Sequence, residues 1–101
     1  MKPQTRPFDV TEMLQTEADI AEYLSVVLED GDPDLLAATL GDIAKARGMT
    51  EIAKASGLTR EALYKALRPG SQPRFDTILK VIHALGLRLE TRPGRQTTAH
   101  A

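Results

Sequence analysis

Hydrogen-bonding and cationic side chains repeat at helical spacing between positions 59 and 68. At about 100° per residue, one face of a helix over this stretch presents Arg60, Glu61, Tyr64, Lys65 and Arg68. Arginine donates two parallel hydrogen bonds to guanine O6 and N7, and glutamate accepts one from cytosine N4. The pattern therefore predicts a helix that reads base edges in the major groove of DNA.

Individual roles follow from side-chain chemistry and from position along this helix. Arg60, near the helix start, is the best candidate for a bidentate contact with guanine. Lys65 and Arg68 either read guanine or hold phosphate, and Glu61 either accepts from cytosine or orients Arg60. Tyr64 is expected to hydrogen-bond a phosphate or to pack on a thymine methyl group. The other expected DNA contacts are Thr50, Lys54, Thr59 and Arg74. Ordinary surface charge is the alternative interpretation of all these residues.

Two short helices and a tight turn are expected to hold this face in place. Ala53 is small enough to let a second helix cross closely, and Gly57 suits a turn with positive φ. Thr59 is a good N-cap for the following helix. Leu63 and Leu67 are four residues apart, so they share the face that points back towards Ala53. The sequence thus predicts that Leu side chains bury one side of the reading helix.

Apolar periodicity, capping residues and turn chemistry predict an all-α bundle of five to six helices. The predicted helices cover residues 9–14, 17–30, 33–47, 50–56, 59–67 and 75–85. In the last one, the apolar stripe runs from Phe75 through Ile78 and Ile82. We expect a flexible arm at 1–8, an acidic helical extension at 9–31, a DNA-binding domain at 32–91 and a disordered tail at 92–101.

Residues 87–91 alternate apolar and polar side chains and predict a short strand. A lone strand has unpaired edges, and its simplest partner is the same strand of a second copy across a two-fold axis. We therefore expect a homodimer in which Leu87 and Leu89 contribute to the interface. The acidic N-terminal helix is the alternative site of dimerisation.

Charge is segregated along the chain, although the net charge is only −1. Residues 9–43 contain ten acids and no Lys or Arg, whereas residues 44–80 contain eight bases and three acids. This asymmetry indicates two surfaces for two partners of opposite charge.

Composition argues against several other classes of protein. The chain has 101 residues and no Cys, which indicates one small domain without a disulfide, a thiolate metal site or a Cys nucleophile. No apolar run approaches the ~20 residues of a membrane span, and the N-terminus lacks the apolar core of a signal peptide. We expect a cytoplasmic, nucleoid-associated protein that is not an enzyme and has no cofactor or metal. His83, in the last predicted helix, is expected to be structural or partly exposed.

Several segments of the chain together resemble a known family. Ala53, Gly57 and Leu63 stand at the spacing of the Cro/repressor-type helix-turn-helix. Over residues 8–90 the chain resembles the addiction-module antidote proteins, the antitoxins of bacterial toxin–antitoxin pairs. The matching segments are 23–24, 28–33, 38–48, 58–67 and 75–87. The resemblance implies a lambda-repressor-like (Cro/Xre) fold of the HigA-like type, binding to double-stranded operator DNA, repression of the chain's own operon, and a toxin partner.

The resemblance also implies that the toxin is a RelE-like mRNA interferase. Such a toxin is expected to be basic, because it must hold RNA. An acidic surface on this chain would steer the toxin and cover its cationic site. The residues assigned to that surface are Glu17, Asp19, Glu22 and Glu29. The alternatives are a stand-alone transcriptional repressor without a toxin and a protein-binding scaffold that has lost DNA binding.

Overall fold

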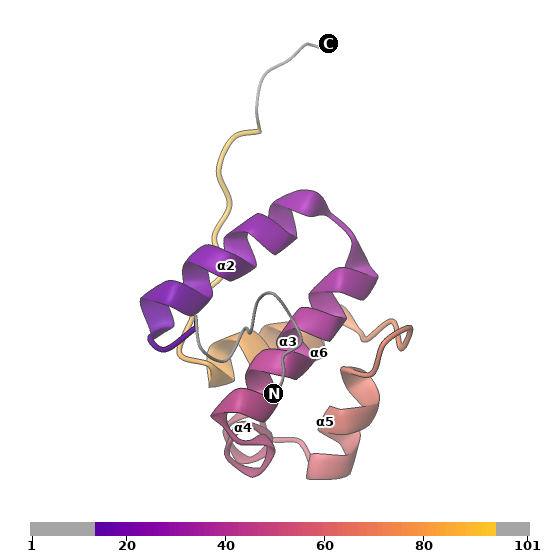
Figure 1. Cartoon of the computed structure of the whole chain (residues 1–101). Coiled ribbons are helices and arrows are strands. Elements are labelled where there is room, and N and C mark those ends of the chain that lie inside the picture. The colour runs from indigo at the N-terminus through magenta and orange to yellow at the C-terminus, as the bar shows by residue number, and fades with distance from the viewer. Residues whose placement is uncertain (1–13, 95–101) are drawn as a thin grey trace, which may run out of the picture.

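The computed structural model describes residues 14–94, which form five helices (Figure 1). They are α2 (Glu17–Asp30), α3 (Pro33–Arg47), α4 (Met49–Ser56), α5 (Arg60–Ala66) and α6 (Phe75–Ala84). α3 runs through the middle, α2 crosses one end, and α4 and α5 lie at the other (Figure 1). α4 packs against α3, α5 and α6, while α2 packs against α3. The arm predicted at 1–8, most of the helix predicted at 9–14 and most of the predicted tail lie outside the described residues.

Capping residues account for where α2 begins and ends and for where α3 begins. Thr16 caps α2 by accepting a hydrogen bond from the backbone of Asp19, whose carboxylate accepts one in return. Gly31 closes α2 with φ +80, a left-handed conformation that costs glycine little. Asp32 then caps α3 through the backbone N–H groups of residues 34 and 35, with Pro33 at the first helical position. These starts agree with the sequence-based boundaries.

The connection between α4 and α5 is a turn of three residues. Gly57 has φ +77, and its N–H donates to the carbonyl of Lys54 at 3.2 Å. Leu58 donates to the carbonyl of Ala53 at 2.9 Å, which completes the end of α4. Thr59 caps α5 by accepting a hydrogen bond from the N–H of Ala62 at 3.0 Å. Local hydrogen bonds therefore fix the path of the chain from α4 into α5.

The core forms where α3, α4, α5 and α6 meet under α2. Its largest fully buried side chains are Ile20, Leu40, Ile43, Leu63, Val81 and Ile82. Burying one such side chain contributes about 1.5–3 kcal/mol. α3 also approaches α5 closely at Gly41, where an added Cβ would lie 3.1 Å from the carbonyl oxygen of Leu67. Gly41 therefore sets how closely α5 approaches α3.

One expectation from the sequence is wrong, and a second is not met within the described residues. Phe75, which periodicity placed on the apolar stripe of the last helix, is 68% exposed. Periodicity assigns a face to a residue, but burial at a helix end also requires a neighbour that reaches the first turn. The predicted strand at 87–91 is absent from the structure of residues 14–94. A strand is defined by ladder hydrogen bonds, and one chain offers this segment no second strand.

Candidate nucleic-acid interface

The outward face of α5 carries the side chains that the sequence assigned to base reading. Leu63 is fully buried and Leu67, just past the helix, is 4% exposed, which anchors the inner side. Arg60, Glu61, Tyr64, Lys65 and Arg68 are all exposed. The structure therefore brings these five predicted residues onto one surface, with their apolar neighbours beneath them.

Arg60 and Tyr64 contact each other on this surface. The guanidinium carbon of Arg60 lies 5.6 Å from the centroid of the Tyr64 ring, which is a cation–π arrangement. Glu61 forms no ion pair with Arg60 within the described part of the chain. Tyr64, rather than Glu61, is therefore the side chain that orients Arg60 in the free protein.

A cleft of about 290 Å³ separates α5 from α3. Lys65 and Arg68 line one side of it, and Asp42 and Lys45 of α3 line the other. Sequence reasoning did not assign Lys45 to the site, although it lies in the basic last turn of α3. Lys45 is about twenty positions from Lys65 in sequence, and the crossing of α3 and α5 brings the two side chains to the same cleft. Three cations thus surround one cleft at the edge of the outward face of α5.

Thr50 and Lys54 are exposed on α4. α4 begins at Met49, one residue before the predicted start, because Gly48 ends α3 and begins α4 without a spacer. Gly48 has no side chain to cap the first N–H groups of α4. Uncapped N–H groups at a helix N-terminus favour an anion. Thr50 therefore lies beside free N–H groups, and Lys54 adds a cation one turn later, whereas Glu51 places a carboxylate in the same first turn.

Thr59 and Arg74 lie at the margins of the reading surface. The hydroxyl of Thr59 is already used to cap α5, so its first role is to fix the start of that helix. Arg74 is highly exposed and forms an ion pair with Asp76 at 3.3 Å. Exposed ion pairs of this kind contribute little energy, so Arg74 can exchange Asp76 for another anion at low cost.

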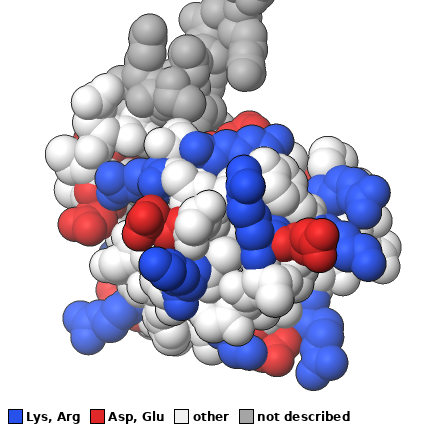
Figure 2. Space-filling view, turned by 90° about the horizontal axis from the view of Figure 1, so that it is seen from below, with Lys and Arg blue, Asp and Glu red and all other residues white. Residues whose placement is uncertain are grey.

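The end of the molecule formed by α4 and α5 is basic. Figure 2 shows this end from below, with Lys and Arg side chains spread across it and a smaller number of Asp and Glu between them. The acids among residues 44–80 are Glu51, Glu61 and Asp76, against eight Lys and Arg. A surface with this balance of charge attracts a polyanion and speeds its association.

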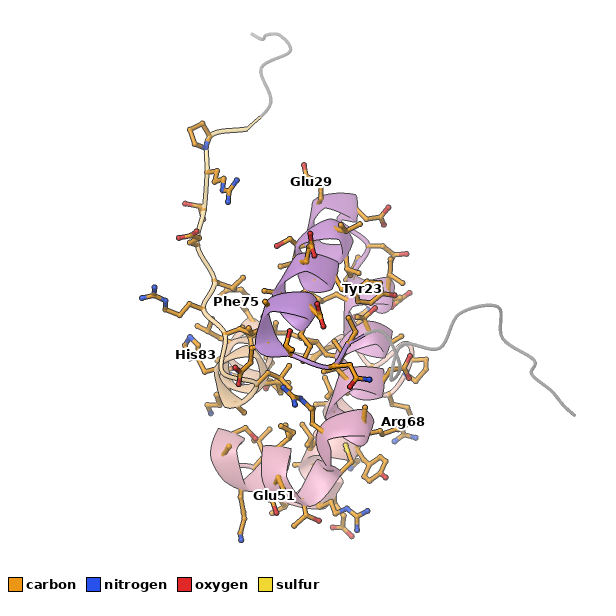
Figure 3. The ribbon with its side chains drawn as sticks, turned by 60° about the vertical axis from the view of Figure 1, so that its left-hand side comes forward. Tyr23, Glu29, Glu51, Arg68, Phe75 and His83 are labelled. Atoms are coloured by element: carbon orange, nitrogen blue, oxygen red, sulfur yellow. The ribbon has the colours of Figure 1, made fainter. Side chains whose placement is uncertain are left out.

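The acidic helix α2 lies at the opposite end of the molecule from α4 and α5 (Figure 1). Glu22 and Glu29 are exposed and seven residues apart, so they share one strip of α2. Glu29 lies at one end of the molecule in Figure 3, far from Arg68 and Glu51 at the other. The fold thus separates the two charge signs that the sequence segregates.

The other two acids assigned to a partner contact groups within the chain. The carboxylate of Glu17 lies against Gly86, where an added Cβ would approach Oε2 to 3.0 Å. The carboxylate of Asp19 accepts the hydrogen bond from the backbone of Thr16 in the capping box. The structure therefore does not bring the four predicted acids together in one patch.

A family model described as "Probable addiction module antidote protein" matches residues 4–93. The chain belongs to this family. The match covers all five described helices and both charged ends of the molecule.

A curated relative of this antidote-family chain is known from Haemophilus influenzae (strain Rd), where it is described as an uncharacterized protein. The two are 42% identical over 95 residues, which cover 94% of this chain and 98% of the relative. No solved structure matched the chain. The family resemblance expected from the sequence is therefore confirmed, whereas the finer HigA-like assignment remains a prediction.

Residues 14–94 of this antidote-family chain carry few groups suited to other chemistry. His83 is exposed on α6 (Figure 3), and no cluster of three or more His, Cys, Asp or Glu within these residues is arranged to hold a metal ion. Over the same residues, no helix is long and apolar enough to cross a membrane.

Proposed function

We propose that this chain is the antitoxin of a type II toxin–antitoxin pair and acts by binding rather than by catalysis. In this proposal α4 and α5 form a lambda-repressor-like helix-turn-helix that binds operator DNA and represses the chain's own operon. The acidic end binds and neutralises a basic, RelE-like mRNA interferase. The observation that carries the proposal is the exposed row of Arg60, Tyr64, Lys65 and Arg68 on α5 above the buried Leu63.

DNA reading is assigned first to Arg60. Its contact with Tyr64 restricts the guanidinium before DNA arrives, so less rotamer entropy is lost when it pairs with guanine. Lys65, Arg68 and Lys45 around the cleft are suited to phosphate or to a neighbouring guanine. Thr50 and Lys54 would meet the backbone at the N-terminus of α4. In this proposal Arg60 contacts a base, and the surrounding residues contact mainly phosphates.

Operator binding by this chain is proposed to require two copies. A single module of this size contacts few base pairs, and helix-turn-helix proteins reach specific affinity as dimers on half-sites about one helical turn apart. The half-buried Leu87 and Leu89, next to α6 in sequence, are the proposed dimer contacts. A two-fold symmetric protein then predicts a palindromic operator.

Toxin binding is assigned to α2, chiefly to Glu22 and Glu29. Both carboxylates are exposed, whereas Glu17 and Asp19 already contact groups of their own chain. An RNA-cleaving toxin carries a cationic RNA site, and an acidic helix complements it. Because α2 lies away from α4 and α5 (Figure 1), toxin and DNA can be bound at the same time.

Growth and reporter assays in one strain test this function. Induction of the adjacent reading frame alone should arrest growth, and induction of this chain with it should restore growth. A reporter behind the chain's own promoter should be repressed by the chain. Repression without rescue would instead make the chain a stand-alone repressor, and rescue without repression would refute the DNA-binding half of the proposal.

Reversal of both exposed acids on α2, Glu22→Lys with Glu29→Lys, should weaken toxin binding about tenfold or more. Each change replaces an attraction towards a cationic surface by a repulsion, which lowers the association rate most at low salt. Titration calorimetry with the purified toxin measures the effect. The matched control is Glu51→Lys with Glu61→Lys, which alters the same net charge at the other end of the molecule. Equal losses in the two double variants would refute α2 as the docking surface.

A further inference from the structure

The segment that follows α6 has the side-chain pattern of a strand but lacks a strand's hydrogen bonds. The N–H of Leu87 donates to the carbonyl of Ile82 at 3.2 Å. Beyond it, residues 88–94 form no backbone hydrogen bond with any other described residue. Leu87 and Leu89 are half-buried against the core, while Arg88 and Glu90 are exposed. With respect to residues 14–94, the segment therefore has a row of unpaired backbone groups that another chain could bind.

Space for a second strand lies beside this segment. A groove of about 780 Å³ runs between α2 and residues 86–92. Leu24 and Leu28 of α2, with Leu87 and Leu89, form an apolar strip in it. Its remaining lining is largely polar and comprises Ser25, Glu29, Arg88, Glu90 and Arg92 among others, so Glu29 borders both this groove and the proposed toxin surface. Leu28 is 38% exposed, so apolar surface remains open to solvent here. An extended strand with apolar side chains on one face and charged ones on the other fits such a site.

We propose that residues 87–91 pair antiparallel with the same residues of a second copy, with the two-fold axis passing through Leu89. In that register Leu89 faces Leu89 of the second copy, and Arg88 faces Glu90 of the second copy. By symmetry Glu90 also faces Arg88 of the second copy, so the ladder contains two opposite-charge pairs. The segment is self-complementary in charge, which identifies a second copy of this chain as the occupant.

Neighbouring registers are excluded by the same residues. An axis at Arg88 would set two arginines directly opposite each other, and an axis at Glu90 would set two glutamates opposite. If the axis passed between two neighbouring residues, Arg88 of one copy would share a face of the ribbon with the leucines of the other copy. The leucines of one copy would then face solvent. With the axis at Leu89, the half-buried leucines of both copies lie on one face of the ribbon, towards their own cores.

This inference specifies how the dimer of the proposed function forms, so it rests on that proposal. It is tested on the full chain without DNA, which keeps its failure distinct from a failure of DNA binding. Sedimentation equilibrium should show a dimer for the native sequence. Arg88→Glu makes both facing positions acidic and Glu90→Arg makes both basic, so each should weaken self-association about tenfold or more. The doubly exchanged variant, Arg88→Glu with Glu90→Arg, should restore it.

A mixture of the two single variants tests the pairing of residue 88 with residue 90 most directly. A chain with Arg88→Glu and a chain with Glu90→Arg have complementary charges at both facing pairs, so the mixture should dimerise although neither variant does so alone. Lys80→Glu, an exposed change of the same charge on α6, is the control and should leave self-association unchanged. A monomeric native chain would overturn the proposal. So would a dimer that is indifferent to the single changes, or a mixture that stays monomeric.

Discussion

Arg60→Ala is expected to weaken binding to the operator by about 1–3 kcal/mol, which corresponds to roughly 5- to 150-fold. The side chain is exposed on the outer face of α5 and is oriented by the Tyr64 ring 5.6 Å away. Without the two hydrogen bonds from Arg60 to guanine, the protein no longer distinguishes guanine from other bases at that base pair. The preference should therefore relax at one position in each half-site and stay unchanged elsewhere.

Fluorescence anisotropy with the operator and with single-base variants of it separates this effect from a general loss of affinity. Lys54→Ala is the contrasting variant, because a phosphate contact has no base to read. It should weaken binding to all sequences alike and lower the slope of log K against log salt by about one. If Arg60→Ala also weakens all sequences alike, Arg60 is a phosphate contact and the base reader lies elsewhere on α5.

Leu63→Ala is expected to lower the free energy of unfolding by about 2–5 kcal/mol, because it leaves a cavity at a fully buried position. The whole domain is expected to be stable by only about 5–15 kcal/mol, so this is a large fraction of the total. Leu63 lies on the side of α5 opposite the row of charged residues. DNA affinity should therefore fall together with stability, because the helix that presents the readers is no longer held.

Urea denaturation followed by far-UV circular dichroism measures this change. Leu63→Met conserves most of the volume and should cost less than about 1.5 kcal/mol. Val26→Ala, at a position 66% exposed on α2, should change stability by no more than about 0.5 kcal/mol. A loss below about 1 kcal/mol for Leu63→Ala would mean that α5 is not anchored through this residue.

Helix starts and the turn before α5 were predictable because their causes are local in sequence. Thr16, Asp32 and Thr59 each cap a helix through N–H groups two or three residues away. Gly57 takes the left-handed conformation that the turn demands. The row of exposed side chains on α5 follows from helical periodicity once Leu63 is assigned to the inside.

Features that depend on contacts between distant segments were not predictable in the same way. Lys45 joins Lys65 and Arg68 only because α3 crosses α5 at Gly41. Phe75 is exposed although it has the spacing of a buried residue. These outcomes depend on where one helix ends relative to another, which side-chain periodicity does not encode.

The acidic surface shows a similar limit of sequence reasoning. Composition identifies an acidic segment. It does not distinguish a carboxylate that contacts groups of its own chain from one that is exposed and available to a partner. Asp19 belongs to the cap of α2 and Glu17 lies against Gly86. Glu22 and Glu29 face outward on one strip. We therefore propose Glu22 and Glu29 before Glu17 and Asp19 as toxin contacts.

Selection from random DNA duplexes with the purified full chain, at near-physiological salt, tests most directly whether α5 reads a sequence. The account predicts enrichment of a palindrome whose half-sites lie about ten base pairs apart, centre to centre. Recovery of no preferred sequence, with only weak binding that disappears as salt rises, would contradict it. In that case the basic end of the molecule would be a non-specific surface, and toxin binding by α2 would be the function left to test.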